Sequence, residues 1–276
     1  MDKTSLGDRM KNNYENISRY YLTRRMPVII RVDMKAGHTF TKGLKKPFDD
    51  VFVKSMQDTM RYLCKNIQGC VLGYTQSDEI SLALTDYAEL TTDAWFGNNL
   101  QKMCSVSASM ATLAFNQAFN RNYLSRLARK IDTLDTTKDT TEYIKVLEKV
   151  KDKGAMFDSR VFTIPKEEVC NYFIWRQQDA IRNSIQSVGQ ANFSSKELHR
   201  KSCKDIQDML MTKKGINWDD FATTLKRGSC CIKFDDSFIQ YDSVGSICVF
   251  IQRSRWDIDN KTPIFSQNRE YIEGLI

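Results

Sequence analysis

Acidic residues at two separate points in the sequence are the best candidates for chemistry. Asp33 follows the apolar run 27–32, and Asp78 with Glu79 lies between two further strand-like runs. Neighbouring carboxylates repel each other unless a cation lies between them, and Mg²⁺ prefers oxygen ligands. Two such ions, about 3.5–4 Å apart, can hold the attacking and leaving oxygens of a phosphoryl transfer. If the fold brings the acids together, they predict a magnesium site; otherwise they are ordinary polar turn residues.

The remaining composition narrows the possible chemistry. The chain has only two histidines, His38 and His199, which excludes a site built on several imidazoles. No two of its eight cysteines stand in C-x-x-C spacing, so the usual signature of a four-cysteine zinc site or a thioredoxin-like pair is missing. Neither a Walker A motif nor G-x-G-x-x-G occurs. Any chemistry must therefore rest on carboxylates, hydroxyls or cations.

The hydrophobic pattern predicts the elements that carry these acids. The β-branched run 27–32 predicts a strand buried on both faces. Apolar residues three or four apart over 52–67, after the N-cap candidates Asp49 and Asp50, predict an amphipathic helix. The strand-like runs on either side of 76–79 predict a hairpin with the acids at its tip.

A second helix and a fourth strand complete the order. The helix is expected from near Trp95 through Phe115, and a strand over 160–164 ends before Pro165. This is the split βαβ, ferredoxin-like order, in which the first and third strands pair antiparallel at the sheet centre and the aspartates meet. We therefore expect an α+β fold, a polymerase-palm-like (ferredoxin-like βαββαβ) antiparallel sheet with helices on one face plus a helical C-terminal subdomain.

The chain is expected to form a single catalytic unit over 1–276. Its palm-like core would span 22–165, with a charged, solvated insertion at about 121–153, and 166–276 would form a helical subdomain ending in short strands. The N-terminus is polar and no apolar run approaches membrane-spanning length, so a cytoplasmic location is expected. A net charge of +7 permits a polyanionic partner without demanding one.

Six short motifs follow one another along the chain. RVDMKAGHTF begins at Arg31, KPFDD at Lys46, QSDE at Gln76, WFGNNLQK at Trp95, FDSR at Phe157 and WRQQDAIRNSI at Trp175. Together they resemble the tRNA(His) guanylyltransferase superfamily of 3′-to-5′ polymerases, whose first motif reads R-x-D-G-R/K-x-F-H-x-F. The resemblance extends to about Gly228 and implies a palm like that of ordinary polymerases.

The resemblance implies a role for each matching position. Asp33, Asp78 and the main-chain carbonyl of Met34 would hold two Mg²⁺ ions, with Glu79 as the adjoining catalytic acid. RNA contacts are implied at Arg176 and Asn183. Binding of ATP, GTP or other nucleoside triphosphates is implied at Asp33, Met34, Lys35, Ala36, Gly37, His38, Lys46, Asp49, Ser77, Asp78 and Lys102.

Several substitutions separate the chain from the family's eukaryotic guanylating branch. The family's glycine after the first aspartate is Met34 here, and an aromatic position is Gly37. A left-handed backbone at that point would strain Met34. The His-Ile-Asn-Asn stretch associated with the His anticodon is replaced over 180–184, and Asn98 with Asn99 replaces basic residues. The chain therefore resembles the guanylyltransferase-like proteins that repair 5′-truncated tRNAs.

The resemblance implies template-dependent, 3′-to-5′ addition of nucleotides to the 5′ end of tRNA, after ATP or GTP activates the 5′-monophosphate. It also implies a homotetramer, a dimer of dimers, that works on tRNA and nucleoside triphosphates away from membranes. Three alternatives remain: G-1 addition confined to tRNA(His), another palm-type nucleotidyl transfer or cyclisation, and a degenerate palm that only binds RNA. Asp33 and Asp78 would serve any of the enzymes, whereas Met34 motivates the last alternative.

Overall fold

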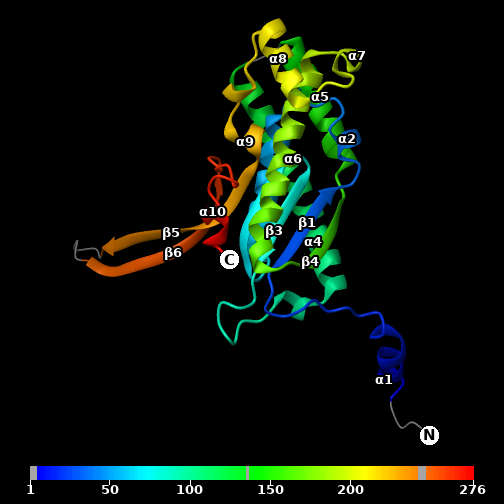
Figure 1. Ribbon diagram of the computed structural model, residues 1–276, viewed down its shortest axis with the longest axis vertical. Helices are drawn as coiled ribbons and strands as arrows, with labels where there is room; N and C mark the ends of the chain where they lie inside the picture. The colour runs from blue at the N-terminus through cyan, green and yellow to red at the C-terminus, as the bar shows by residue number, and fades with distance from the viewer. Residues whose placement is uncertain (1–4, 135–136, 242–246) are drawn as a thin grey trace.

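An antiparallel sheet of six strands forms the centre of the molecule (Figure 1). The computed structural model describes residues 5–134, 137–241 and 247–276. Their side chains are described except within 235–253. Along the sheet the strand order is β4-β1-β3-β2-β5-β6. The first and third strands are adjacent and antiparallel, as the sequence predicts. The bounds are β1 Val28–Met34, β2 Cys70–Gln76, β3 Glu79–Leu84, β4 Phe157–Thr163, β5 Ser229–Tyr241 and β6 Ile247–Asp259.

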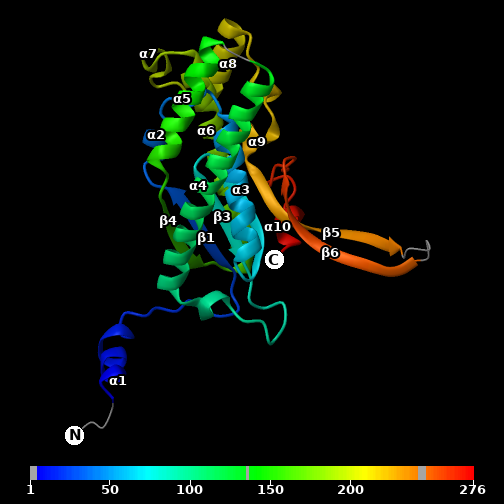
Figure 2. The ribbon, with the colours of Figure 1, turned by 180° about the vertical axis from the view of Figure 1, so that it is seen from behind.

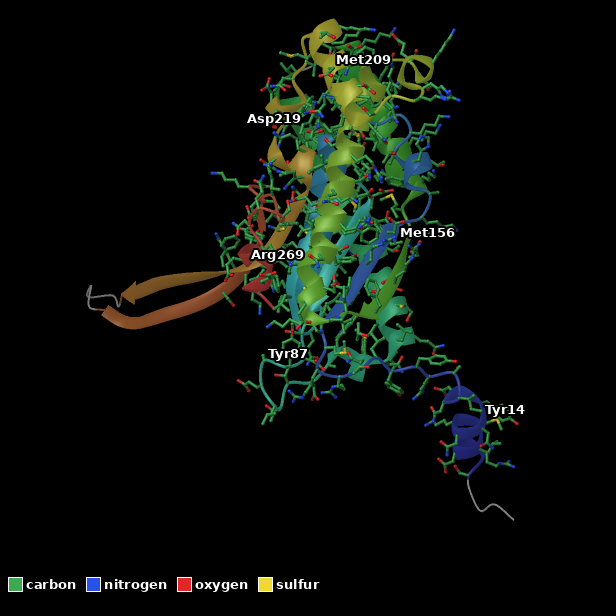
Figure 3. The ribbon with its side chains drawn as sticks, in the orientation of Figure 1. Tyr14, Tyr87, Met156, Met209, Asp219 and Arg269 are labelled. Carbon is green, nitrogen blue, oxygen red and sulfur yellow. The ribbon has the colours of Figure 1, made fainter. Side chains whose placement is uncertain are left out.

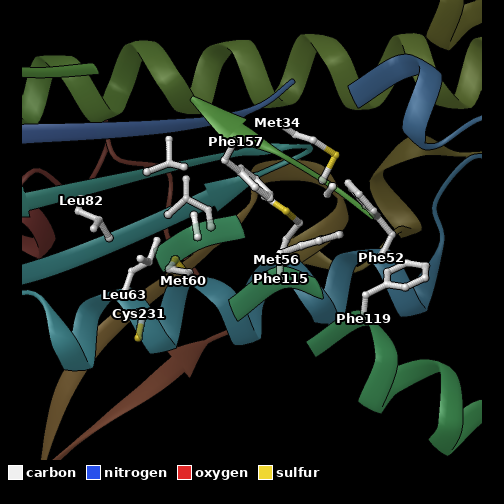
Figure 4. Close-up of a cluster of buried hydrophobic side chains, with 14 of the residues drawn as sticks. Met34, Phe52, Met56, Met60, Leu63, Leu82, Phe115, Phe119, Phe157 and Cys231 are labelled. Atoms are coloured by element: carbon white, nitrogen blue, oxygen red, sulfur yellow. The ribbon is translucent and has the colours of Figure 1, made fainter. Parts of the chain in front are cut away.

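Two long helices, α3 (Asp50–Asn66) and α4 (Leu100–Asp132), cover one face of this sheet (Figure 2). The predicted cap is present, because the Asp49 carboxylate accepts a hydrogen bond from the amide of Phe52 at 3.0 Å. Alternate residues of the strands point to these helices and pack among their apolar side chains, so the core lies between the layers. Figure 4 shows part of it, including Met34, Met56, Met60, Leu63, Leu82 and Phe115.

The opposite face is covered by α6 (Lys166–Asn192), the first helix of the C-terminal part. Ile29 and Ala83 belong to this second apolar cluster together with Phe173 of α6 and Phe265. The expected fold class, an α+β palm-like antiparallel sheet with a helical C-terminal part, is confirmed. The added detail is that α6 lies directly on the sheet, so helices lie on both of its faces.

The stretch 121–153 differs from the expected solvated insertion. It comprises the end of α4 and a second helix, α5 (Lys138–Lys153). Tyr143, Ile144, Leu147 and Val150 of α5 are buried in the main core, because their spacing places them on one side of the helix. The charged residues face solvent, but this stretch also supplies part of the core.

Two further expectations are corrected. β5 and β6 are not short strands: each has 13 residues, and they pair with each other from Cys230–Asp259 to Tyr241–Ile247, projecting from the body (Figure 1). The second helix begins at Leu100 rather than near Trp95. A short 3₁₀ turn, η2 (Trp95–Asn98), precedes it, and left-handed residues within that turn interrupt the helix.

The remaining elements are short. α1 and a π-helical turn, η1, form an N-terminal segment that stands away from the body (Figures 1 and 2). No helix in the described part of the chain combines the length and apolar character needed to cross a membrane. The bounds are α1 Leu6–Met10, η1 Lys11–Glu15, α2 Gly37–Phe40, α7 Ser195–Leu198, α8 Cys203–Lys214, η3 Trp218–Asp220, α9 Thr223–Arg227 and α10 Glu270–Glu273.

Candidate active site

The pairing of β1 with β3 brings the two acidic segments together. Asp33, near the end of β1, lies directly opposite Glu79 at the start of β3. The amide of Met34 donates a hydrogen bond to the carbonyl of Asp78 at 3.1 Å. Ser77 and Asp78 form the two-residue turn between β2 and β3, and Ser77 takes the left-handed conformation with φ 50°. The convergence expected from the strand order is therefore present.

This end of the sheet concentrates negative charge. The pKa of Asp33 is raised from 3.8 to about 6, mainly by burial and then by the carboxylates of Asp78, Glu79 and Asp158, against a smaller opposing effect of Arg31. Asp158 contributes because it lies opposite Asp33 on β4. A cation between Asp33 and Asp78 would relieve this repulsion.

The donor set fits Mg²⁺. Within the described residues, no group of three or more His, Cys, Asp or Glu side chains is arranged to hold a metal ion. Mg²⁺ bound with a nucleotide commonly uses only one or two carboxylates, and substrate phosphates and water complete its octahedron. The carboxylates of Asp33 and Asp78, with the main-chain carbonyl of Met34, could supply that small set.

The loop after β1 is shaped around Asp78. A Cβ atom on Gly37 would lie 1.8 Å from Oδ2 of Asp78, so only glycine fits beside this carboxylate in its present position. Met34 belongs to β1, is 2% exposed and does not have a positive φ, so the strain expected there is absent. The left-handed residue is Ala36, with φ 55°, because the strand continues through Met34 before the chain turns.

The same loop offers main-chain donors. The amide of Lys35 donates a hydrogen bond to the carbonyl of Met156. Figure 3 labels Met156, well away from Tyr87. The amides of Ala36, Gly37 and His38 have no acceptor among the described residues. Gly37 lies beside Asp78. Successive amides without an acceptor at such a position suit the predicted contact with phosphate oxygens.

Glu79 has a different environment from the two aspartates. It is 6% exposed, and Nη1 of Arg176 donates to its Oε2 at 3.0 Å. Nε of Arg31 lies 3.6 Å from the same oxygen, and the Ser81 hydroxyl donates to Oε1 at 3.3 Å. The carboxylate of Glu79 thus already has protein partners on both oxygens.

The two residues expected to contact RNA lie on α6 near Asp179. Arg176 is only 5% exposed and pairs with both Glu79 and Asp179, so its guanidinium is not presented to an RNA strand as expected. Asn183 is half-buried, and its side-chain amide donates to Asp179 at 3.4 Å. Within the motif that begins at Trp175, Arg176 therefore links α6 to the sheet.

Two of the expected nucleotide contacts, Asp49 and Lys46, lie in the segment just before α3. Asp49 is buried and accepts from the amides of Lys45 and Phe52 and from the Tyr143 hydroxyl, so it acts as a helix cap rather than an open phosphate contact. Lys46 is exposed in the loop before α3, and its contact with a nucleotide stays a prediction.

Lys102 lies away from the aspartates of its own chain. It is in the first turn of α4, whereas Thr112 of α4 accepts a hydrogen bond from Phe157, the β4 residue opposite Met34. Ten helical residues separate Lys102 from Thr112, a distance of about 15 Å. The motif match that suggested Lys102 gives the residue type but not its distance from Asp33 and Asp78.

Two residues near the site were not singled out from the sequence. Arg31 and Asp158 face the α6 side of the sheet with Asp33, because Arg31 precedes it by two residues and Asp158 lies opposite it. Arg31 could have been found from the sequence, because it is the one charged residue in the apolar run 27–32 and lies two positions before Asp33. Asp158 needed the β1–β4 register, which the sequence pattern does not supply.

Comparisons with known proteins agree with this architecture. The model of the Thg1 family, described as tRNAHis guanylyltransferase, matches residues 7–165. A bacterial tRNA(His) guanylyltransferase (Thg1)-like protein solved with ATP is 45% identical over 99% of both chains, with a TM-score of 0.77. A structure of a protein of the same description, solved with GTP, is 43% identical over 99% of both chains, with a TM-score of 0.73.

A more distant structure shares the fold. It is the tRNA(His) guanylyltransferase of Saccharomyces cerevisiae, 20% identical over 80% of this chain and 92% of that one, with a TM-score of 0.56. No curated protein sequence matched the chain. With the family model covering more than half of the residues and a relative 45% identical over nearly the full length, the chain belongs to the tRNA(His) guanylyltransferase (Thg1) family of nucleotidyltransferases.

Proposed function

We propose that this protein adds nucleotides to the 5′ end of tRNA in the 3′-to-5′ direction and so repairs 5′-truncated tRNAs. The observation that carries the proposal is the convergence of Asp33 and Asp78 at one end of the β1–β3 pair. The similar bacterial structures hold ATP and GTP, which supports nucleoside triphosphates as substrates. Membership of the family supports tRNA as the acceptor.

The reaction has two displacements. The RNA 5′-monophosphate attacks the α-phosphorus of ATP or GTP, which forms a nucleotidylylated 5′ end and releases pyrophosphate. The 3′-hydroxyl of the incoming nucleoside triphosphate then attacks the activated 5′ phosphate, and the nucleoside monophosphate leaves. Each cycle extends the RNA by one nucleotide at its 5′ end.

Asp33 and Asp78 would hold two Mg²⁺ ions with the carbonyl of Met34. When bound, these ions neutralise the triphosphate and lower the pKa of the attacking hydroxyl. The protein's own contribution is to hold the carboxylate of Asp33, on β1, beside that of Asp78, in the turn before the paired strand β3. Gly37 leaves room for Asp78, and the amides of 36–38 would receive phosphate oxygens that the carboxylates repel.

The family's description favours a second candidate, addition of a single G at position −1 of tRNA(His). An assay separates the two. Purified protein is incubated with Mg²⁺, ATP, all four nucleoside triphosphates and several 5′-monophosphorylated tRNAs that lack one or more 5′ nucleotides. Repair predicts extension of each tRNA until the acceptor stem is paired. Addition confined to tRNA(His) at position −1 would favour the second candidate.

We also propose a homotetramer, a dimer of dimers, on the basis of the family resemblance. Lys102 lies far from the aspartates of its own chain, so a nucleotide or RNA contact by this residue would require another subunit. Light scattering after gel filtration measures the mass directly. A mass near four times 32.0 kDa supports the proposal, and a monomer would reject it.

A further inference from the structure

Four polar side chains link α6 to β3 within an otherwise apolar interface. The hydroxyls of Ser81 and Tyr172 lie 2.8 Å apart, and Arg176 donates to Glu79 at 3.0 Å. We call these four residues the α6–β3 clamp. Tyr172 and Arg176 lie about 6 Å apart along the helix axis, and Glu79 and Ser81 lie about 6.6 Å apart along the strand. Because these spacings are nearly equal, both contacts can form at once. The clamp therefore fixes the position of α6 along β3.

One carboxylate in the clamp interacts with two cations, the buried Arg176 and the partly buried Arg31. Glu79 Oε2 accepts from Arg176 and lies 3.6 Å from Arg31, for which it is the one ion-pair partner among the described residues. The Nε atoms of both arginines are buried without a hydrogen-bond partner. Loss of either cation would leave the carboxylate of Glu79 less compensated in a poorly hydrated site, which is costly.

The clamp directly adjoins the turn that carries Asp78. Glu79 is the next residue in the chain, and it lies opposite Asp33 in the β1–β3 register. Arg31 is on β1, two residues before Asp33 and on the same face. Through Glu79, the three elements β1, β3 and α6 are tied together beside both aspartates.

We infer that Arg176 is a positioning residue that acts through Glu79 to hold the turn bearing Asp78 in register with Asp33. The inference rests on the proposed function, because that function gives the relative position of the two aspartates its importance. Trp175 reinforces the arrangement: the guanidinium carbon of Arg176 lies 3.6 Å from the centre of its ring. The ring is half-exposed and shields the guanidinium, in keeping with a supporting rather than an RNA-contacting role.

The experiment compares four single variants and a double variant with the wild type. Arg176→Met keeps the length of the side chain and removes the charge, and Arg176→Lys keeps the charge. Arg61→Met is the matched control, since Arg61 is an exposed helical arginine with its own Asp58 partner, outside the site. Glu79→Gln with Arg176→Met completes a double-mutant cycle with Glu79→Gln alone.

Two readouts are measured: thermal unfolding of the metal-free proteins, and the kcat, nucleotide KM and Mg²⁺ half-saturation of nucleotide addition. Arg176→Met should lower the Tm by about 6–15 °C, and adding Glu79→Gln should restore part of that loss. At a temperature where the variant is folded, kcat should fall, or Mg²⁺ half-saturation should rise, by about 10–100-fold, with nucleotide KM changed far less. Arg176→Lys should recover part of the loss, and Arg61→Met should match the wild type.

Asp78→Ala is assayed in parallel so that two failures can be told apart. If the wild type adds no nucleotide to tRNA, the proposed function fails and the inference fails with it. If Asp78→Ala leaves addition intact, the assignment of Asp78 to the metal site fails, and the inference, which depends on that assignment, fails too. If Asp78→Ala abolishes addition while folded Arg176→Met keeps the wild-type kcat and Mg²⁺ half-saturation, only the inference is overturned. Additive Tm changes for Glu79→Gln and Arg176→Met would also overturn it, because coupling between the two side chains is what the clamp requires.

Discussion

At the scale of single residues, the three acids of the site divide into two kinds. Asp33 and Asp78 have no cationic side chain within ion-pair distance in the described part of the chain, whereas Glu79 has two. The sequence marks all three as candidate catalytic acids, because it shows which residue types are present but not which groups face them. The uncompensated aspartates are those left to bind an added cation.

The raised pKa of Asp33 predicts a measurable effect on stability without metal. Since the folded-state pKa is about 6 against 3.8, the folded form loses stability as pH rises between these values. Asp33→Asn should therefore be more stable than the wild type at pH 7.5 in EDTA, by about 1 kcal/mol after allowance for solvent screening, or roughly 2–4 °C in Tm. At pH 4 the difference should largely vanish, and Mg²⁺ with GTP should stabilise only the wild type. A variant less stable at pH 7.5 would contradict this electrostatic account.

Gly37 gives a second prediction at this scale. Gly37→Ala should displace the Asp78 carboxylate, because the new Cβ would lie 1.8 Å from Oδ2. Its φ is not positive, so alanine fits the backbone and the Tm should change little. A shift of an ångström at a reacting group can cost about 10²-fold in rate, so nucleotide addition should fall by that order. Gly7→Ala, which meets only Ser5 at 3.9 Å, is the control. Wild-type activity in Gly37→Ala would show that Asp78 has another productive position.

At the scale of elements, the spacing of apolar residues predicts those helices and hairpins whose position depends on nearby residues. α3 begins after Asp49 as its cap and apolar spacing indicate, and the β2–β3 hairpin turns at Ser77 and Asp78 as expected. α5 was not recognised as part of the core because its charged residues outnumber the four apolar ones that form its buried side. Overall polarity concealed a short but regular amphipathic pattern.

The buried side of α5 predicts a large effect on stability. Leu147 is 0% exposed within the main core, so Leu147→Ala should cost about 2–5 kcal/mol. Lys149→Ala, on the exposed side of the same helix, should change stability by no more than about 0.5 kcal/mol. Denaturant unfolding of both variants measures the difference. Equal stabilities would mean that the stretch behaves as the solvated insertion that its charge suggests.

At the scale of the whole molecule, topology determines which distant residues meet. The strand order was sufficient to bring Asp33 and Asp78 together, because paired antiparallel strands place the end of one beside the start of the other. It could not reveal that α6 covers the second face, nor that Arg176 is buried there, since these depend on side-chain contacts almost 100 residues apart. It also could not separate Lys102 from the site, because a motif match carries no distance.

The central claim is that Asp33 and Asp78 together bind magnesium with a nucleoside triphosphate. The most direct test is a crystal structure of this protein with GTP and Mg²⁺. We expect a metal ion that bridges a carboxylate oxygen of each aspartate to the triphosphate, with metal–oxygen distances of about 2.0–2.1 Å. A bound triphosphate with the two carboxylates turned apart and no cation between them would contradict it.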